Sequence, residues 1–326
     1  TEDGKTTVQI ELDYPAKTQG PVIEEMVRAK LVEAGIPADV KISQNIIAHE
    51  VQRGVKVFDS VRNIIAVSSG KGGVGKSTVS ANLALALQQE GAKVGLLDAD
   101  VYGPSQPTML GITDKPYSVD GKTLEPMVAH GLQVASVGVL IDPDQPMIWR
   151  GPLAVSALQQ LLKQTNWKDL DYLIVDMPPG TGDIQLSLSQ EVPVTGAVVV
   201  TTPQDIALMD ARKGLVMFEK VNVPILGIIE NMATHICSKC GHEEHIFGEG
   251  GAAKMAAQYG VELLGELPLD INIRLSMDKG EPIVISDPDS KVAQAYREIA
   301  RKLAVAVSKK NKDYSAKMPS IKVSDT

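Results

Sequence analysis

The sequence is poor in cysteine, since Cys237 and Cys240 are the only two among 326 residues. One close pair is no disulfide framework, so we expect a reducing, cytoplasmic compartment and thiols that bind metal or act in redox chemistry. No apolar run approaches the roughly 18 residues of a membrane-spanning helix, and no basic-then-apolar leader stands at the N-terminus. We therefore expect no membrane partner. Because the chain opens at Thr1 rather than Met, we also expect its original start to be absent.

The chain also has no excess of positive charge, since 32 Lys and Arg stand against 40 Asp and Glu, for a formal net charge of -8. This balance gives no general attraction to nucleic acid or anionic lipid, so nucleic acid is not an expected partner. Hydrophobic residues make up 44 % and charged residues 22 %, which is typical of a folded protein. The length predicts about two domains.

The first part of the chain predicts a small α+β domain. Apolar residues alternate over Thr6–Leu12, as in a half-buried strand, and recur at helical spacing over Pro21–Ala34. A second short strand is expected at Val40–Ile42. We therefore expect a small domain over residues 1–55, followed by a linker over residues 56–62.

From residue 63 the apolar runs no longer alternate, which is typical of strands buried on both faces of a parallel sheet. The expected strands are Ile64–Val67, Val94–Leu97, Leu132–Val137, Tyr172–Val175, Ala197–Val200, Ile225–Ile229 and Leu263–Leu267, and the expected helices are Thr78–Gln89, Ala154–Lys163, Ala207–Val221, Ala252–Tyr259 and Asp289–Val307. Their alternation predicts an α/β domain with a doubly wound, mostly parallel sheet over residues 63–307. A flexible tail is expected over residues 308–326.

A phosphate-binding loop lies between the first of these strands and the first of these helices. Its residues are Gly70, Lys71, Gly72, Gly73, Val74, Gly75, Lys76 and Ser77, with Thr78 next. The glycines let backbone N–H groups approach phosphate oxygens, and the following helix points its positive end at the same anion. We expect ATP here, with Lys76 at the β and γ phosphates and Ser77 on Mg²⁺. The alternative is a glycine turn without a ligand.

Lys71 occupies a position that the general loop pattern leaves free. With this lysine, the segment resembles the deviant Walker A loop of the MinD and ParA class, which includes the nitrogenase iron protein. The resemblance implies a homodimer with ATP at its interface, in which Lys71 reaches the partner's nucleotide. A solvated loop lysine is the alternative.

Three aspartates follow or end predicted strands, at the edge of the sheet where ligands bind in such folds. They are Asp98, Asp100 and Asp176, and each alone is also compatible with a capping or turn role. The resemblance implies that Asp100 positions or deprotonates the attacking water, and that Asp98 supports Mg²⁺ through water. It further implies that Asp176 is an outer-shell Mg²⁺ partner, followed by a switch loop that senses the γ-phosphate.

Asn231 follows the predicted strand Ile225–Ile229. The same resemblance implies that Asn231 contacts adenine and that Pro268–Asp270 lies near the base. An asparagine after a strand is also a common turn former, so this signal is weaker than the loop.

Cys237 and Cys240 have the spacing of a metal knuckle, and Gly241 tolerates the left-handed turn that follows. A redox pair of the thioredoxin kind is one alternative, although that motif belongs at the start of a helix. A zinc site completed by His242 and His245 is another, with unusually tight spacing. In a third interpretation, two chains contribute two thiolates each to a [4Fe–4S] cluster on a twofold axis.

Together these motifs resemble the Mrp/ApbC family of iron–sulfur cluster carriers. The resemblance rests on the loop, on Asp98–Ser105, on Asp176–Asp183 and on the cysteine pair before Ile246–Gly248. It implies a homodimer that binds a [4Fe–4S] cluster, hydrolyses ATP slowly, receives clusters from the assembly machinery and delivers them to apo iron–sulfur proteins.

The N-terminal segment resembles the small domain that precedes the ATPase in many bacterial members, in a truncated form. Relatives often carry a cysteine in its first loop, whereas Tyr14–Thr18 has none, so we expect a scaffold or docking role. Two other function classes stay open at this point. One is a partitioning switch of the ParA or MinD kind, driven by ATP-dependent dimerisation, and the other is a zinc-binding metallochaperone.

Overall fold

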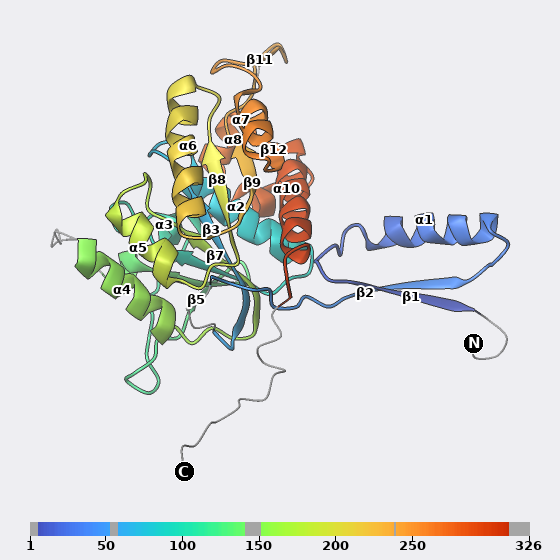
Figure 1. Ribbon diagram of the computed structural model, residues 1–326, viewed down its shortest axis with the longest axis horizontal. Coiled ribbons are helices and arrows are strands. Elements are labelled where there is room, and N and C mark those ends of the chain that lie inside the picture. The colour runs from blue at the N-terminus through green and yellow to red at the C-terminus, as the bar shows by residue number, and fades with distance from the viewer. Residues whose placement is uncertain (1–5, 53–57, 141–150, 238, 313–326) are drawn as a thin grey trace.

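The computed structural model describes residues 6–52, 58–140, 151–237 and 239–312. Residues 56 and 57 of the expected linker and residues 313–326 of the expected tail lie outside the described residues. The same holds for residues 53–55 at the end of the expected small domain and for Ser238 between the two cysteines. The described residues form an α/β body from which a smaller βαβ unit extends to one side (Figure 1). Among them, no helix combines the length and the apolar character that crossing a membrane requires.

The body is built on an eight-stranded sheet with the strand order β12-β9-β8-β3-β7-β4-β6-β5. Its strands are β3 (Val61–Ser68), β4 (Val94–Asp98), β5 (Met127–Ala129), β6 (Leu132–Ser136), β7 (Leu170–Asp176), β8 (Gly196–Thr201), β9 (Ile225–Glu230) and β12 (Leu263–Glu266). All neighbours are parallel except β5, which pairs antiparallel with β6 at one edge. The predicted fold class is therefore confirmed, and each expected strand is present.

Alternate residues of the central strand pack on opposite faces of the sheet. In β3, Ile65 and Val67 belong to the core on one face, whereas Ile64 and Ala66 belong to the core on the other. All four are at most 3 % exposed. A strand with water on one face would need polar residues at every second position, so the continuous apolar runs follow from burial on both faces.

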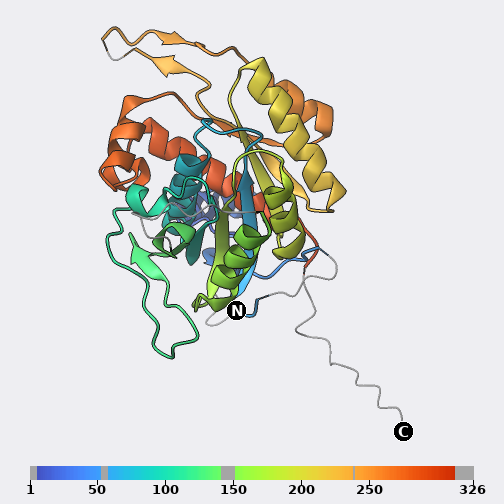
Figure 2. The ribbon, with the colours of Figure 1, turned by 90° about the vertical axis from the view of Figure 1, so that its left-hand side faces the viewer.

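Helices cover both faces of this sheet (Figures 1 and 2). One face carries α2 (Lys76–Gln89), α8 (Ile271–Asp278), α9 (Ile283–Ser286) and α10 (Lys291–Ser308). The other carries α4 (Gly151–Gln164), α5 (Asp183–Glu191), α6 (Asp205–Lys220) and α7 (Gly251–Tyr259). The expected helices are all present, with ends shifted by at most three residues.

Several short elements have no counterpart in the sequence prediction. They are α3 (Gln106–Met109), the 3₁₀ turn η1 (Val137–Leu140), the helices α5, α8 and α9, the edge strand β5, and the strands β10 (His235–Ile236) and β11 (Glu243–Glu244). The strand expected to reach Val137 ends at Ser136, where η1 begins. Elements of two to four residues carry too little periodicity to be predicted, and the longer α5 and α8, of nine and eight residues, were also missed.

The order of the strands brings three candidate segments together. Strand β7 lies between β3 and β4 and pairs with both, so their carboxyl ends are neighbours. Asp98 and Asp176 are directly opposite each other in the register of β4 and β7. The glycine-rich loop follows β3, so all three segments meet at one edge of the sheet, where ligands bind in doubly wound folds.

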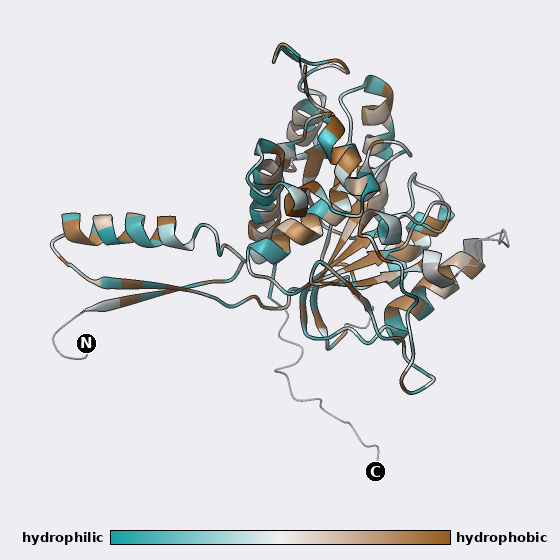
Figure 3. Ribbon diagram, turned by 180° about the vertical axis from the view of Figure 1, so that it is seen from behind, coloured by the Kyte–Doolittle hydropathy of each residue, from teal (hydrophilic) through white to brown (hydrophobic). Residues whose placement is uncertain are grey.

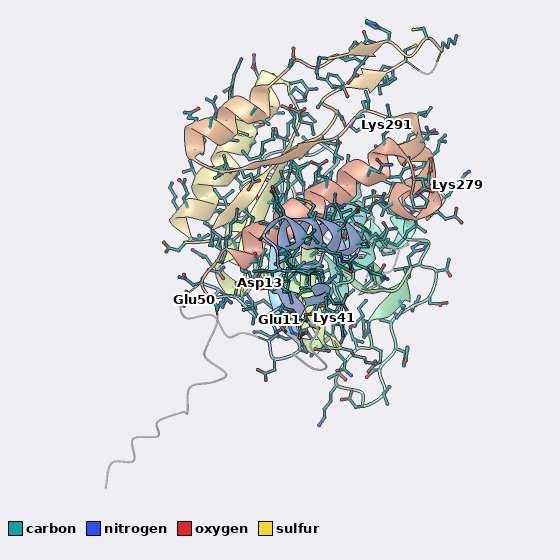
Figure 4. The ribbon with its side chains drawn as sticks, turned by 90° about the vertical axis from the view of Figure 1, so that its right-hand side faces the viewer. Glu11, Asp13, Lys41, Glu50, Lys279 and Lys291 are labelled. Atoms are coloured by element: carbon teal, nitrogen blue, oxygen red, sulfur yellow. The ribbon has the colours of Figure 1, made fainter. Side chains whose placement is uncertain are left out.

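The N-terminal βαβ unit consists of β1 (Thr7–Leu12), α1 (Gly20–Glu33) and β2 (Asp39–Gln44), with β1 and β2 paired in parallel. It extends away from the sheet of the body (Figures 1 and 3), and Glu11 and Lys41 mark its two strands in Figure 4. None of the residues of α1 is buried, and Val22 and Met26 are 50 % and 64 % exposed. The three expected elements are present, while the domain boundary at residue 55 remains a prediction.

A buried glutamate anchors the βαβ unit to the body. Glu90, directly after α2, is fully buried and accepts hydrogen bonds from the Thr18 hydroxyl (2.7 Å) and backbone N–H (3.0 Å). Arg301 of α10 donates to the same carboxylate at 2.6 Å. A buried charge needs such partners, so this contact joins α1, α2 and α10 at one point.

Candidate functional site

The glycine-rich loop over residues 70–77 lies between β3 and α2, as the sequence predicts. Gly73 and Gly75 have φ angles of 83° and 81°, in the left-handed region that favours glycine. Gly70 is required for a different reason, because a Cβ there would lie 2.1 Å from the carbonyl carbon of Asp210 on α6. The loop therefore depends on glycine both for its turn and for its close contact with α6.

The loop lines a cavity of about 210 Å³ at the carboxyl edge of the sheet. The lining residues are Ser69, Lys71, Gly72, Gly73, Gly75, Lys76, Ser77, Thr78, Asp100, Ser105, Met109 and Pro179. Most of the predicted loop residues are among them, but Gly70 and Val74 are not. The N-terminus of α2 contributes free backbone N–H groups and the positive end of its dipole, so the cavity is suited to an anion.

Lys76 lies at the centre of a cluster of carboxylates and is only 5 % exposed. Its Nζ donates to Asp176 Oδ1 at 2.5 Å and lies 3.7 Å from Asp100 Oδ2. Its Nζ is also 3.2 Å from the Ser77 hydroxyl oxygen. In this arrangement the ammonium group neutralises two aspartates, so a phosphate entering the cavity would compete with them for the same charge.

Asp176 is fully buried and is held by three donors. Besides Lys76, the Ser80 hydroxyl donates to Oδ1 at 3.0 Å, and the Gln106 side-chain amide donates to Oδ2 at 2.8 Å. Sequence reasoning missed both neutral partners. Ser80 could have been found, because it lies one helical turn after Lys76, whereas Gln106 lies in a loop-like stretch without a motif.

Asp98 is also fully buried, but it faces the segment that follows it. Its Oδ2 accepts from the backbone N–H groups of Ser105 and Gln106 (both 3.1 Å) and from the Ser136 hydroxyl (3.0 Å). Burial, together with the nearby charge of Asp176, raises the pKa of Asp98 to about 7. These contacts fix the loop after β4, and the Mg²⁺ role of Asp98 stays a prediction.

Asp100 and Lys71 both line the cavity. Asp100 Oδ1 accepts from the backbone N–H groups of Tyr102 (3.2 Å) and Gly103 (3.3 Å), while Oδ2 faces Lys76. Lys71 is half-buried and forms no ion pair with any residue that the structure describes. The catalytic roles of Lys71 and Asp100 stay predictions.

Asn231, directly after β9, contacts the phosphate loop rather than solvent. Its side-chain amide donates to the Val74 carbonyl oxygen at 2.8 Å, and its Nδ2 lies 2.3 Å from where a Cβ of residue 75 would be. Pro268–Asp270 lines a separate cavity of about 650 Å³ beside His235 and Ile236. The adenine contact of Asn231 remains a prediction.

The cysteine pair lies in the turn of a hairpin that projects from the body, formed by β10 and β11 (Figure 2, orange strands at the top). Cys237 is partly exposed and Cys240 is exposed, and both are free thiols. The Cys237 N–H donates to the His242 carbonyl, and the Gly241 N–H donates to the Cys237 carbonyl, both at 2.8 Å. Gly241 has the predicted left-handed conformation, with a φ of 71°.

Backbone N–H groups of Lys239 and Cys240, and the Cys240 side chain, lower the pKa of the Cys237 thiol. Within residues 6–52, 58–140, 151–237 and 239–312, no group of three or more His, Cys, Asp or Glu side chains could hold one metal ion. His245 is instead engaged with the Ala233 carbonyl at 3.0 Å. The described residues therefore give no support to a complete zinc site within one chain.

Comparison with known proteins places these features in a family. Residues 60–304 match the model of the ParA family described as NUBPL iron-transfer P-loop NTPase. The iron–sulfur cluster carrier protein of Salmonella typhimurium is 56 % identical over 303 residues, which cover 91 % of this chain and 82 % of that protein.

Two solved structures are similar to this chain. A nucleotide-binding protein of Archaeoglobus fulgidus, in complex with ADP, has a TM-score of 0.63 and 37 % identity, covering 72 % of this chain and 92 % of its own. The septum site-determining protein MinD of Pyrococcus horikoshii, with Mg-ADP, has a TM-score of 0.54 and 26 % identity, covering 73 % of this chain and 94 % of its own.

Proposed function

Because the chain belongs to the ParA family of P-loop NTPases, and within it to the iron–sulfur cluster carriers that its motifs resemble, we propose that it carries a [4Fe–4S] cluster between proteins. Two copies of the chain hold the cluster across a homodimer interface. The cluster is cargo: it comes from the assembly machinery and is transferred to apo iron–sulfur proteins.

The cysteine hairpin is the observation that carries this proposal. Cys237 and Cys240 are accessible, and no third His, Cys, Asp or Glu of the described residues completes a metal site around them. A [4Fe–4S] cluster takes four thiolates, so two chains related by a twofold axis supply the full set. A site with two ligands per chain at an exposed turn releases its cargo readily, which suits transfer.

The second part of the proposal is that the phosphate loop binds and hydrolyses ATP with Mg²⁺. Oxygen donors suited to a hydrated Mg²⁺ ion lie around Lys76 Nζ, since the Ser77 hydroxyl and the carboxylates of Asp100 and Asp176 are all close to it. When bound, Mg²⁺ neutralises phosphate charge. The ADP and Mg-ADP in the two similar structures support this assignment.

The proposed catalytic roles of Lys76, Lys71 and Asp100 follow from their positions around the cavity. Lys76 exchanges its contact with Asp176 for the β and γ phosphates, and Lys71, free of ion pairs within the described part of the chain, reaches the nucleotide of the partner subunit. Asp100 lines the cavity and orients the attacking water. The backbone N–H groups of the loop and of the start of α2 bind the phosphate oxygens.

Five residues of chain, 232–236, separate Asn231 at the nucleotide site from Cys237 at the cluster site. Asn231 donates to the Val74 carbonyl of the phosphate loop, and the chain then runs through buried Ala233 to Cys237. The Ala233 N–H donates to the Leu267 carbonyl at 2.9 Å, and His235 forms a β-bridge with Leu269. We infer that dimer closure on ATP moves this segment and changes the cluster affinity, which requires ATP to prefer one dimer state.

Anaerobic reconstitution tests the cluster. We expect the purified full chain, supplied with iron and sulfide, to become brown and to contain about four iron and four sulfide per dimer. The double variant C237S/C240S should lose the cluster completely while still binding ATP. As the matched control, H242A/H245A should retain the cluster, since neither imidazole is a ligand in this proposal.

Three results would contradict the proposal. They are a full cluster in C237S/C240S, a fully loaded monomer in analytical ultracentrifugation, and a colourless protein that contains zinc and loses it in H242A/H245A.

A further inference from the structure

Gln106, the first residue of α3, is buried between Ser77 at the start of α2 and Asp176 at the end of β7. It is fully buried, and its Nε2 donates to the Ser77 carbonyl oxygen at 2.9 Å and to Asp176 Oδ2 at 2.8 Å. Both amide hydrogens are therefore used. Asp98 fixes the backbone of this residue by accepting from its N–H. The side chain thus connects the first turn of α2 with the end of β7.

The other end of this amide has no partner. Gln106 Oε1 is buried and accepts no hydrogen bond from the residues that the structure describes. Bond lengths place it about 2.2 Å from Nε2, which itself donates to Asp176, so Oε1 lies within about 5 Å of that carboxylate. Turning the amide over gives no relief, because Oε1 would then face two acceptor oxygens. A buried acceptor without a donor costs about 1–3 kcal/mol, so Oε1 is the group of this amide still open to a hydrogen-bond donor.

A second buried glutamine shows what a purely structural amide looks like in this fold. Gln52 donates through Nε2 to the Ser189 and Val192 carbonyl oxygens at 2.7 and 3.1 Å, and its Oε1 accepts from the Val194 N–H at 2.8 Å. Every hydrogen-bonding group of Gln52 thus has a partner. Gln106 differs from Gln52 in that its Oε1 accepts no hydrogen bond from the described residues. This oxygen lies near Asp176, the carboxylate that the proposed function assigns to the outer shell of the magnesium ion.

We propose that Gln106 is a positioning residue for the magnesium ion of the bound nucleotide. Its Nε2 holds Asp176 and the Ser77 backbone in place, and its Oε1 accepts a hydrogen bond from a water molecule of the ion. Water is the proposed donor, because Lys76, the cation nearest to Asp176, already donates to that carboxylate. This inference rests on the proposed nucleotide site and adds a residue that none of its motifs includes.

The proposal makes a prediction about binding rather than turnover. Removing an outer-shell partner of a metal typically weakens metal affinity by 10–100-fold. In Q106L we expect the dissociation constant of a fluorescent ADP analogue to stay within twofold of the unchanged protein in EDTA. The factor by which Mg²⁺ strengthens nucleotide binding should be about tenfold smaller in Q106L than in the unchanged protein. The measurement is a fluorescence titration of the full chain, with and without Mg²⁺.

Q52L is the matched control, since it removes a buried amide far from the phosphate loop. It should lower the melting temperature and leave the Mg²⁺ effect intact. Q106N keeps a polar side chain and serves if Q106L does not fold, with the same loss of the Mg²⁺ effect expected. A Mg²⁺ effect that is unchanged in the folded Gln106 variant overturns the inference. Should the unchanged protein bind no nucleotide, or bind it independently of Mg²⁺, the proposed function itself fails instead.

Discussion

The phosphate site and the cysteine hairpin are built in opposite ways. Lys76 and Asp176 are at most 5 % exposed, and both are held by hydrogen bonds or ion pairs within the chain. Cys237 and Cys240 lie in an exposed turn between two strands of two residues each. The groups of the first site are paired with one another within one chain, whereas the second offers two free thiols.

This difference shows how burial constrains the residues of each site. Buried charges must be paired, so the phosphate site is fixed by the same contacts that hold the core together. Exposed thiols have no such requirement and can exchange a ligand without disturbing the fold. We therefore expect changes in the phosphate site to affect both stability and binding, and changes in the hairpin to affect binding alone.

The largest expected effect on nucleotide binding comes from a substitution of Gly70. In G70A the new Cβ would lie 2.1 Å from the Asp210 carbonyl carbon and 2.5 Å from the Ala211 nitrogen, and backbone cannot move aside cheaply. Overpacking of this kind costs about 1–3 kcal/mol, so the melting temperature should fall by about 5 °C. Nucleotide affinity should fall by more than about tenfold, since the loop is displaced. Calorimetry and nucleotide titration measure the two effects.

G72A is the matched control, because a Cβ at residue 72 meets nothing within 4 Å. Its melting temperature without nucleotide should change by less than about 1 °C. Cluster loading should be normal in both variants if the two regions are independent in stability. Equal melting temperatures for G70A and G72A would refute the close contact with α6.

The next effect concerns the pH dependence of stability and the buried Asp98, and we expect no comparable effect on nucleotide binding. Burial raises its pKa from 3.8 to about 7, so the folded protein keeps a proton that the unfolded chain releases between these values. Stability is therefore lost as the pH rises from about 4 to about 7, by up to roughly 4 kcal/mol for this group. In D98N this contribution should be absent. Urea unfolding at a series of pH values measures it, and parallel curves for both proteins would contradict the expectation.

The smallest effect tests whether the two regions communicate. N231A removes the donor to the Val74 carbonyl, a contact of 2.8 Å worth about 1 kcal/mol. We expect the ratio of cluster transfer rates with and without ATP to move towards one by a few-fold, with loading unchanged. N45A is the control, because Asn45 forms its hydrogen bonds within the described part of the chain to Glu11 and the Leu12 carbonyl, both in the βαβ unit. A ratio unaffected by N231A would remove this route of coupling.

Much of the fold was predictable because burial on both faces leaves a direct mark on the sequence. The runs that became β3, β4, β7, β8 and β9 are continuous and apolar, and the glycine-rich loop identifies the nucleotide end of the sheet. The motif also led to Lys76, Asp100 and Asp176, which the structure brings together. Ser80 and Gln106 were missed, because their contact with Asp176 depends on packing and not on spacing.

The amino-acid sequence by itself determined the fold class, the family and the residues with the chemistry of phosphate and metal binding, because each of these depends on local patterns. The tertiary structure alone decided which of these residues face one another. It placed Lys76 on Asp176, Asn231 on the phosphate loop and Glu90 under the βαβ unit. Such pairs are far apart in the chain, and only the strand order and the packing of helices on the sheet bring them together.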